Sequence, residues 1–189
     1  MLSAGVLIFI DIPILIIMQI MFHLKKVLVL RNLLFCALLF YISLILAITL
    51  FPIPYGWPEP GFIAAYNFIP FNDILLEFGV GFQAAVRNVG GNIVMFLPLG
   101  VILSLIFARK SWLKILWVSA LCSAGIEFMQ FLIGVTVAHW HYRGVNVDDV
   151  ILNTVGAMIG FLIYKLIPQS LKEPFEKQPV QQCPAPAES

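Results

Sequence analysis

The chain has 189 residues, of which 61% are hydrophobic and only 11% are charged. A soluble domain contains roughly 45–50% apolar and about 25% charged residues, so this composition excludes an ordinary soluble domain and indicates a membrane protein. The formal net charge of +1 provides no basic excess that would attract nucleic acid, so no nucleic-acid partner is expected.

Five apolar runs follow one another along the chain, and each has the length of a membrane helix, which needs roughly 17–25 mostly apolar residues. The predicted spans are approximately residues 2–22, 32–51, 88–107, 112–134 and 149–167. They are predicted to be helices because a helix satisfies its own backbone hydrogen bonds in lipid. The expected fold is therefore all-α, a polytopic transmembrane helical bundle.

The basic residues predict the orientation of this bundle. One side of the bundle carries the connection between the first two spans, the connection between the third and fourth spans, and the C-terminal tail. The basic residues in or next to these segments are Lys25, Lys26, Arg31, Arg109, Lys110, Lys114, Lys165, Lys172 and Lys177. Only Arg87 and Arg143 fall on the opposite side. Because cytoplasmic loops carry an excess of Lys and Arg, we expect a multi-pass protein of the cell membrane with its N-terminus outside and its C-terminus in the cytoplasm.

The connections divide the chain into three parts. Residues 1–30 are expected to form the first span and a basic cytoplasmic turn, and residues 31–167 the main transmembrane domain. Residues 168–189, which are rich in Pro, Gln, Lys and Glu, are expected to be a disordered tail. In the outer connection, Asn72 or Asp73 is predicted to cap a short interfacial helix.

Polar side chains are costly inside a membrane, so those in the spans are the first candidates for function. In the fourth span, Ser119, Ser123, Glu127 and Gln130 follow helical spacing and form one stripe. The predicted topology brings candidate ligand-binding residues from several spans to the outer leaflet. They are Asn92, Glu127, Gln130, Arg143, Asp148, Asp149 and Asn153.

Each of these candidates also has a structural interpretation. Glu127 is most simply the buried partner of Arg143, and a direct binding or catalytic role is the alternative. Asp148 and Asp149 are candidates for capping the fifth helix at its positive end. Asn92 is more often a hydrogen-bonding contact between helices than a ligand.

Two further patterns are more readily explained by structure than by chemistry. Gly156 and Gly160 place small residues four apart, which allows another helix to approach closely. His139 and His141 form a weak metal-binding signal in a loop. We therefore expect helix packing at the two glycines, and neither a metal nor another cofactor.

Several motifs occur in an order and at spacings that are specific in combination. They are residues 67–71 (Asn-Phe-Ile-Pro-Phe), 92–100 (Asn-Ile-Val-Met-Phe-Leu-Pro-Leu-Gly), 127–130 (Glu-Phe-Met-Gln), Arg143 and 147–157. Over roughly residues 41–165 the chain thereby resembles the VanZ-like family. Asn146 is a departure, because the family often has an acid before its aspartate pair. The resemblance adds Asn67 to the candidate ligand-binding residues.

The resemblance implies a small integral membrane protein of the bacterial cell envelope. The family takes its name from a member linked to resistance to the glycopeptide antibiotic teicoplanin. We favour a non-enzymatic protein that contacts membrane lipids and binds a lipid-linked or glycopeptide ligand at the outer polar site. The alternative is a membrane-embedded enzyme acting on a lipid-linked precursor, with Glu127 as general acid or base. A transporter fits less well, because no inverted repeat is evident.

Overall fold

The computed structural model of the chain describes residues 1–24, 29–54, 66–107, 112–138 and 144–176. Within them, five helical segments are long and apolar enough to cross a membrane. These segments are Val6–Leu24, Val29–Leu50, Phe82–Phe107, Trp112–Thr136 and Val147–Leu166. The prediction of an all-α bundle with about five spans is therefore confirmed.

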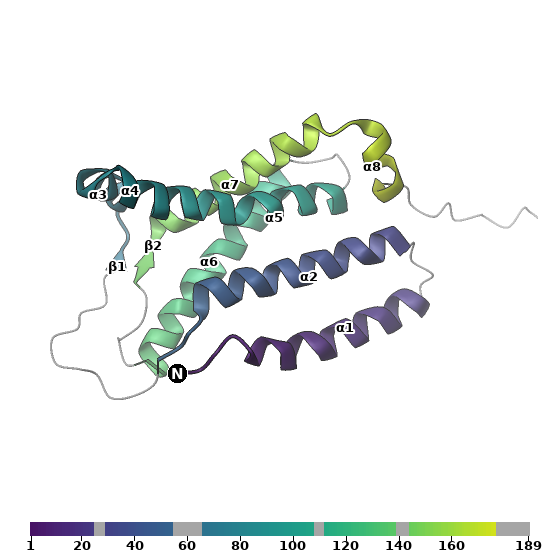
Figure 1. The fold of residues 1–189 in the computed structure, drawn as a ribbon, viewed down its shortest axis with the longest axis horizontal. Helices are drawn as coiled ribbons and strands as arrows, with labels where there is room; N and C mark the ends of the chain where they lie inside the picture. Colours follow the sequence, from purple (N-terminus) through teal and green to yellow (C-terminus); the bar gives the residue numbers. More distant parts are fainter. Residues whose placement is uncertain (25–28, 55–65, 108–111, 139–143, 177–189) are drawn as a thin grey trace, which may run out of the picture.

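The third span is the most irregular of the five (Figure 1). It follows α1 (Val6–Leu24) and α2 (Val29–Leu50). It consists of the short helix α4 (Phe82–Ala85), a π-helical turn η1 (Val86–Gly90) and α5 (Gly91–Phe107). The span therefore begins six residues before the expected position, because apolar residues continue upstream of Arg87.

Two long helices and a short parallel ladder complete the bundle. Helix α6 (Trp112–Thr136) and helix α7 (Val147–Leu166) form the last two spans. Strand β1 (Tyr66–Asn67) pairs in parallel with β2 (Val145–Asn146), so the segment that precedes α3 is held next to the start of α7. Helix α3 (Asn72–Val80) follows β1 and agrees with the predicted short helix.

The segment after the fifth span differs from the sequence prediction. Residues 169–176 were expected to be disordered, but they form helix α8 (Gln169–Glu176). Lys172 in this helix is buried, and its Nζ donates to the carbonyl of Tyr164 at 3.3 Å. A cation near the C-terminal carbonyls of a helix is stabilising, so Lys172 joins α8 to the end of α7. Helix α8 itself packs against α5 and α2. The rest of the expected tail, residues 177–189, lies outside the described part.

Helices α5 and α7 form the closest pair in the bundle. A Cβ atom on Gly156 would overlap the backbone carbonyl of Ile93, and one on Gly160 would overlap that of Leu97. Gly100 faces the backbone of Ala157 in the same way from the α5 side. These glycines allow backbone-to-backbone contact, which is how helices gain packing energy in lipid.

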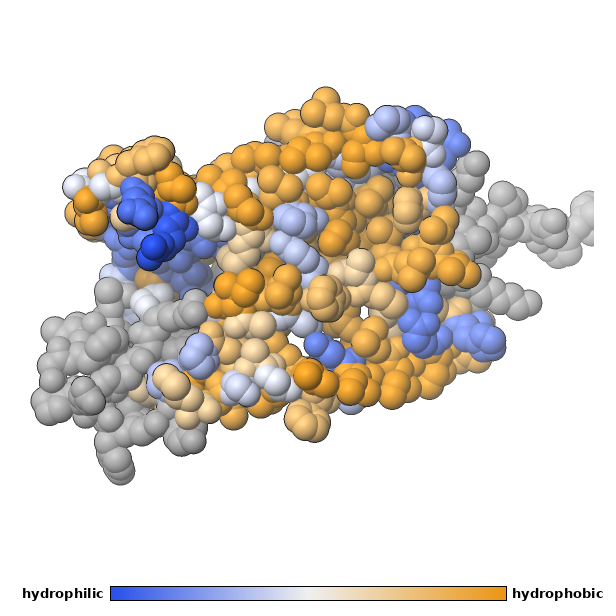
Figure 2. Space-filling view, in the orientation of Figure 1, coloured by the Kyte–Doolittle hydropathy of each residue, from blue (hydrophilic) through white to orange (hydrophobic). Residues whose placement is uncertain are grey.

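The apolar surface is divided between a buried core and an outward face. The core includes Phe96, Leu99 and Ala157, which are at most 1% exposed. Much of the remaining surface is also apolar, as expected where lipid rather than water surrounds the helices (Figure 2). Hydrophilic side chains gather at one end of the molecule, beneath α3 and α4 (Figure 2).

Helix α1 lies along α2 on the side away from α5 (Figure 1). Side-chain hydrogen bonds join the pair. The hydroxyl of Ser43 donates to Asp11 Oδ1 at 2.8 Å, and the amide of Asn32 donates to Gln19 Oε1 at 2.7 Å. These bonds give the polar residues of α1 partners within the apolar part of the protein.

Candidate functional site

Asp148 joins the start of α7 to the start of α3. Its Oδ1 accepts the backbone N–H of Phe71 at 2.5 Å, and its Oδ2 accepts those of Asp73 and Ile74 at 2.9 and 3.1 Å. The first N–H groups of a helix have no intrahelical partner, so a carboxylate from another helix here replaces a local cap. The prediction that Asn72 or Asp73 caps the short helix is wrong, because Phe71 precedes it without a side-chain cap.

Asn146 is the polar residue at the centre of this end of the bundle. Its Oδ1 accepts the backbone N–H of Asp148 at 2.9 Å and so caps α7, the role considered for Asp148 and Asp149. Its amide also donates to Asp73 Oδ2 at 2.9 Å. Asn146, the residue at which the sequence departs from the VanZ-like motif, therefore links α7 to α3.

Asn67 and Glu127 approach Asn146 from two different segments. Asn67 pairs with Asn146 in the β1–β2 ladder and donates its amide to Asn146 Oδ1 at 3.5 Å. Glu127 Oε2 accepts the backbone N–H of Asn146 at 2.8 Å. The hypothetical partner of Glu127, Arg143, lies outside the described residues. Within the described part, Glu127 therefore holds the connection between α6 and α7 through a backbone group.

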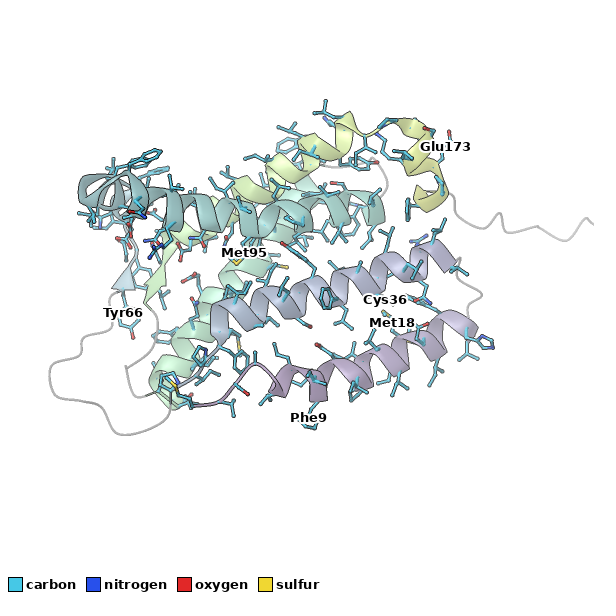
Figure 3. All side chains as sticks on the ribbon, in the orientation of Figure 1. Phe9, Met18, Cys36, Tyr66, Met95 and Glu173 are labelled. Carbon is cyan, nitrogen blue, oxygen red and sulfur yellow. The ribbon has the colours of Figure 1, made fainter. Side chains whose placement is uncertain are left out.

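Two asparagines of the third span bind carboxylates at the same end. Asn92 donates its amide to Asp149 Oδ1 at 2.7 Å, which connects α5 to α7. Asn88 donates its amide to Glu77 Oε1, which connects η1 to α3. Oxygen and nitrogen atoms from these segments gather between α3 and the beginning of α7 (Figure 3).

Gln130 and Asn153 lie in a separate buried contact region. The amide of Gln130 donates to the carbonyl of Thr49 at 3.0 Å, and that of Asn153 donates to Ser123 Oγ at 2.8 Å. Their oxygens, Oε1 and Oδ1, are buried without a hydrogen-bond partner. Gln130 therefore connects α6 to α2, and Asn153 connects α7 to α6. Neither residue is among the described residues that line the large cleft, which is described next.

A cleft of about 780 Å³ lies between α2, α3, η1, α5 and the start of α7. One part of its lining is apolar and includes Leu44, Ile48, Val94 and Met95. Met95 lies on α5 at the side that faces α2 (Figure 3), and its carbonyl accepts the hydroxyl of Tyr41 at 2.9 Å.

The other part of the lining is polar. It consists of Thr49, Asp73, Glu77, Arg87, Asn88, Asn92, Asn146, Asp148 and Asp149. The cleft therefore joins an apolar wall to a polar end, an arrangement that suits a molecule with both an apolar chain and a polar head.

Sequence reasoning selected only part of this lining. Asn92, Asp148 and Asp149 were candidates, whereas Glu77 and Arg87 were not considered as site residues. Glu77 follows Asp73 by four residues, so both lie on one face of α3. That spacing was the available signal for a polar face directed at the bundle.

A smaller cavity of about 270 Å³ lies between α2, α5 and α6. Its lining is almost entirely apolar and includes Ile42, Phe96, Cys122, Gly125 and Met129. A Cβ atom added to Gly125 would meet no other atom within 4 Å. This cavity offers space but few polar groups, so it is a less specific site than the large cleft.

Comparison with known proteins identifies one family. The sequence model described as VanZ/LLP1 matches residues 35–168, which include α5, α6, α7 and all described residues that line the large cleft. No curated protein and no solved structure matches the chain significantly. The matched region begins within α2, so α1 lies outside it.

Proposed function

The chain belongs to the VanZ/LLP1 family of membrane proteins, and on this premise we propose that its large cleft binds an amphiphilic molecule of the bacterial cell envelope. The observation that supports this proposal most directly is the joining of an apolar wall to a polar end within one cleft. An alkyl chain would lie against α2 and α5, where burial of apolar surface is favourable. The head group would meet the side chains of α3 and α7.

We further propose that binding here lowers susceptibility to glycopeptide antibiotics such as teicoplanin. The polar end would face the outer leaflet if the N-terminus is outside and the C-terminus is in the cytoplasm, as the basic residues predict. A lipid-linked precursor or a glycopeptide in that leaflet could then enter the cleft. The protein would act by holding this ligand, without a chemical step.

An enzymatic role for Glu127 has less support from the geometry. One oxygen of its carboxylate accepts the Asn146 N–H, and the side chain is only 6% exposed. Glu127 also does not occur among the described residues that line the cleft. The enzyme hypothesis requires the purified protein to convert a lipid-linked precursor, and release of a product lost in Glu127→Gln would support it.

Gly91 provides a test of the binding proposal. It lines the cleft, and a Cβ atom there meets no other atom within 4 Å, so Gly91→Leu should occupy cleft volume without a backbone clash. Gly90 also has open space but does not line the cleft, so Gly90→Leu is the matched control.

The readout is the teicoplanin concentration that inhibits growth of a susceptible bacterial host producing each protein. We expect the wild type and Gly90→Leu to raise this concentration, and Gly91→Leu to lose the increase at an equal amount of protein in the membrane. An unchanged effect in Gly91→Leu would remove the cleft from the mechanism.

A further inference from the structure

The hydrogen bonds inside the cleft indicate which head group it accepts. Three asparagine amides of the lining donate to carboxylate oxygens of the same lining. The pairs are Asn88 with Glu77, Asn92 with Asp149, and Asn146 with Asp73. A carboxylate has about four acceptor sites, so each one keeps acceptor capacity after such a bond. Each of these amides uses one of its two N–H groups in this way, so the three carboxylates keep more free acceptor sites than the three amides keep free donors.

The charges of the lining favour the same kind of ligand. Among its described residues are four carboxyl groups and one guanidinium group, that of Arg87. Asp148 uses its oxygens on three backbone N–H groups of the α3 segment, so Asp73, Glu77 and Asp149 are the carboxylates left to meet a head group. Clefts lined mainly by one sign of charge attract ligands of the opposite sign.

The apolar wall sets the second requirement. Leu44 and Ile48 lie one helical turn apart on α2, and Val94 and Pro98 lie one turn apart on α5. The two rows extend from the polar end along the direction of the helices. A linear alkyl chain matches this shape better than a compact polar solute.

We propose that the cleft takes an amphiphile whose head group carries a primary ammonium. This inference rests on the proposed function, because it assumes that the cleft is the binding site and specifies the chemistry of its ligand. The ammonium supplies three N–H donors and one positive charge, which match the acceptors and the charge of Asp73, Glu77 and Asp149. A head group that offers only a phosphate would meet one arginine and several carboxylates, and like charges repel.

Two sources provide this chemistry: a bilayer lipid with an ethanolamine head group and a soluble alkylamine. Native mass spectrometry of the full chain in neutral detergent tests the first source. The probes are phosphatidylethanolamine, phosphatidylcholine and phosphatidylglycerol with identical acyl chains. We expect phosphatidylethanolamine to bind about tenfold more tightly than phosphatidylglycerol, because only its ammonium donates charged hydrogen bonds to the carboxylates. Phosphatidylcholine, which keeps the positive charge but lacks N–H donors, should fall between them.

A photoreactive dodecylamine and the corresponding dodecyl phosphate test the second source. If the amine labels α2 or α5 and the phosphate does not, the result supports the ammonium proposal with a soluble amine as the ligand. This conclusion holds even if the three lipids bind equally. Equal or stronger binding of the anionic probe in both assays would overturn the proposal.

The double variant Glu77→Gln with Asp149→Asn separates charge from folding. Each amide keeps an oxygen that can accept from Asn88 or Asn92, so the helix contacts are preserved while two negative charges are removed. We expect the preference for ammonium over phosphate to fall about tenfold, with little change in thermal unfolding. An unchanged preference in the folded double variant would exclude these carboxylates as the selective groups.

Gly91→Leu distinguishes failure of this inference from failure of the proposed function. If Gly91→Leu weakens all probes equally and the wild type shows no head-group preference, the cleft binds amphiphiles but the ammonium inference is wrong. If Gly91→Leu and the control Gly90→Leu bind every probe like the wild type, the cleft is not the site and the proposed function fails as well.

Discussion

The carboxylate of Asp148, in the first turn of α7, accepts the backbone N–H of Asp73 at the start of α3. The residue that precedes α3, Phe71, has a left-handed backbone conformation with φ 67° and provides no side-chain cap. The position of α3 therefore depends on a carboxylate located 75 residues further along the chain. Since α3 contributes Asp73 and Glu77 to the cleft, Asp148 positions part of the binding surface.

Replacement of Asp148 by alanine should release α3 from α7. The N–H groups of Phe71, Asp73 and Ile74 would lose their acceptor, and a buried unsatisfied donor costs about 1–3 kcal/mol. We expect faster amide hydrogen exchange in residues 69–76 and a lower unfolding temperature in detergent. Thr154→Ala is the control, because its hydroxyl bonds only to its own helix in the described contacts. Unchanged exchange in α3 would show that other contacts hold it.

The glycines of α7 should tolerate no side chain at all. A Cβ atom on Gly156 alone would overlap the Ile93 carbonyl, so both Gly156→Ala and Gly156→Leu should lower the folded yield. Because the contact is with backbone atoms, even the methyl group of alanine has no space at this position. Gly125→Ala is the matched control in α6, where the added atom meets open space. The packing interpretation fails if size-exclusion profiles and unfolding temperatures of the Gly156 variants match those of Gly125→Ala.

Glu127 should be replaceable by glutamine but not by leucine. Glutamine keeps a carbonyl oxygen that can accept the Asn146 N–H, whereas leucine leaves this group without its acceptor, at about 1–3 kcal/mol. Thermal unfolding in detergent measures the difference. A large loss in Glu127→Gln would instead indicate that the negative charge itself is required.

Pairing of Glu127 with Arg143 stays a hypothesis that a double-mutant cycle can test. Breaking one partner of a buried pair costs roughly 3–5 kcal/mol, whereas neutralising both can be nearly neutral. If the pair exists, Glu127→Gln combined with Arg143→Gln should recover much of the stability that either single change loses. Additive losses would mean that the two side chains do not interact.

Orientation in the membrane can be measured with single cysteines in a background without Cys36, Cys122 and Cys183. Because basic residues favour the cytoplasmic side, an impermeant thiol reagent added to intact cells should label Gly61→Cys and not Ser111→Cys. Both positions lie outside the described residues. Detergent-permeabilised cells are the control, in which both cysteines should react. Labelling of Ser111→Cys in intact cells would reverse the predicted topology.

The spans were predictable because a bilayer imposes a simple rule on composition. The buried stripe of α6 was also predictable, and Ser119, Ser123, Glu127 and Gln130 are all buried. The partners of these residues were not predictable, because they depend on which helices are adjacent in space. Asn146 is the clearest example: its sequence context suggested a deviation from a motif, whereas its three-dimensional contacts reach α3, α6 and α7.

The cleft itself could not be inferred from periodicity. Its polar lining combines residues from α2, α3, η1, α5, β2 and α7 whose separation in the chain reaches 100 positions, from Thr49 to Asp149. Local spacing places Asn88 and Asn92 on one face but does not indicate which carboxylates they meet. Only the folded chain shows that Glu77 and Asp149 are those acceptors.

The polar contacts between α1 and α2 have a consequence for the order of assembly. Asp11 and Gln19 would be costly in lipid without the partners that Ser43 and Asn32 provide. The two helices are adjacent in the chain, so this hairpin can form as soon as α2 enters the bilayer, before α5 and α7 have been synthesised. Early pairing of this kind would keep α1 from diffusing away and would present α2 already oriented to the later helices.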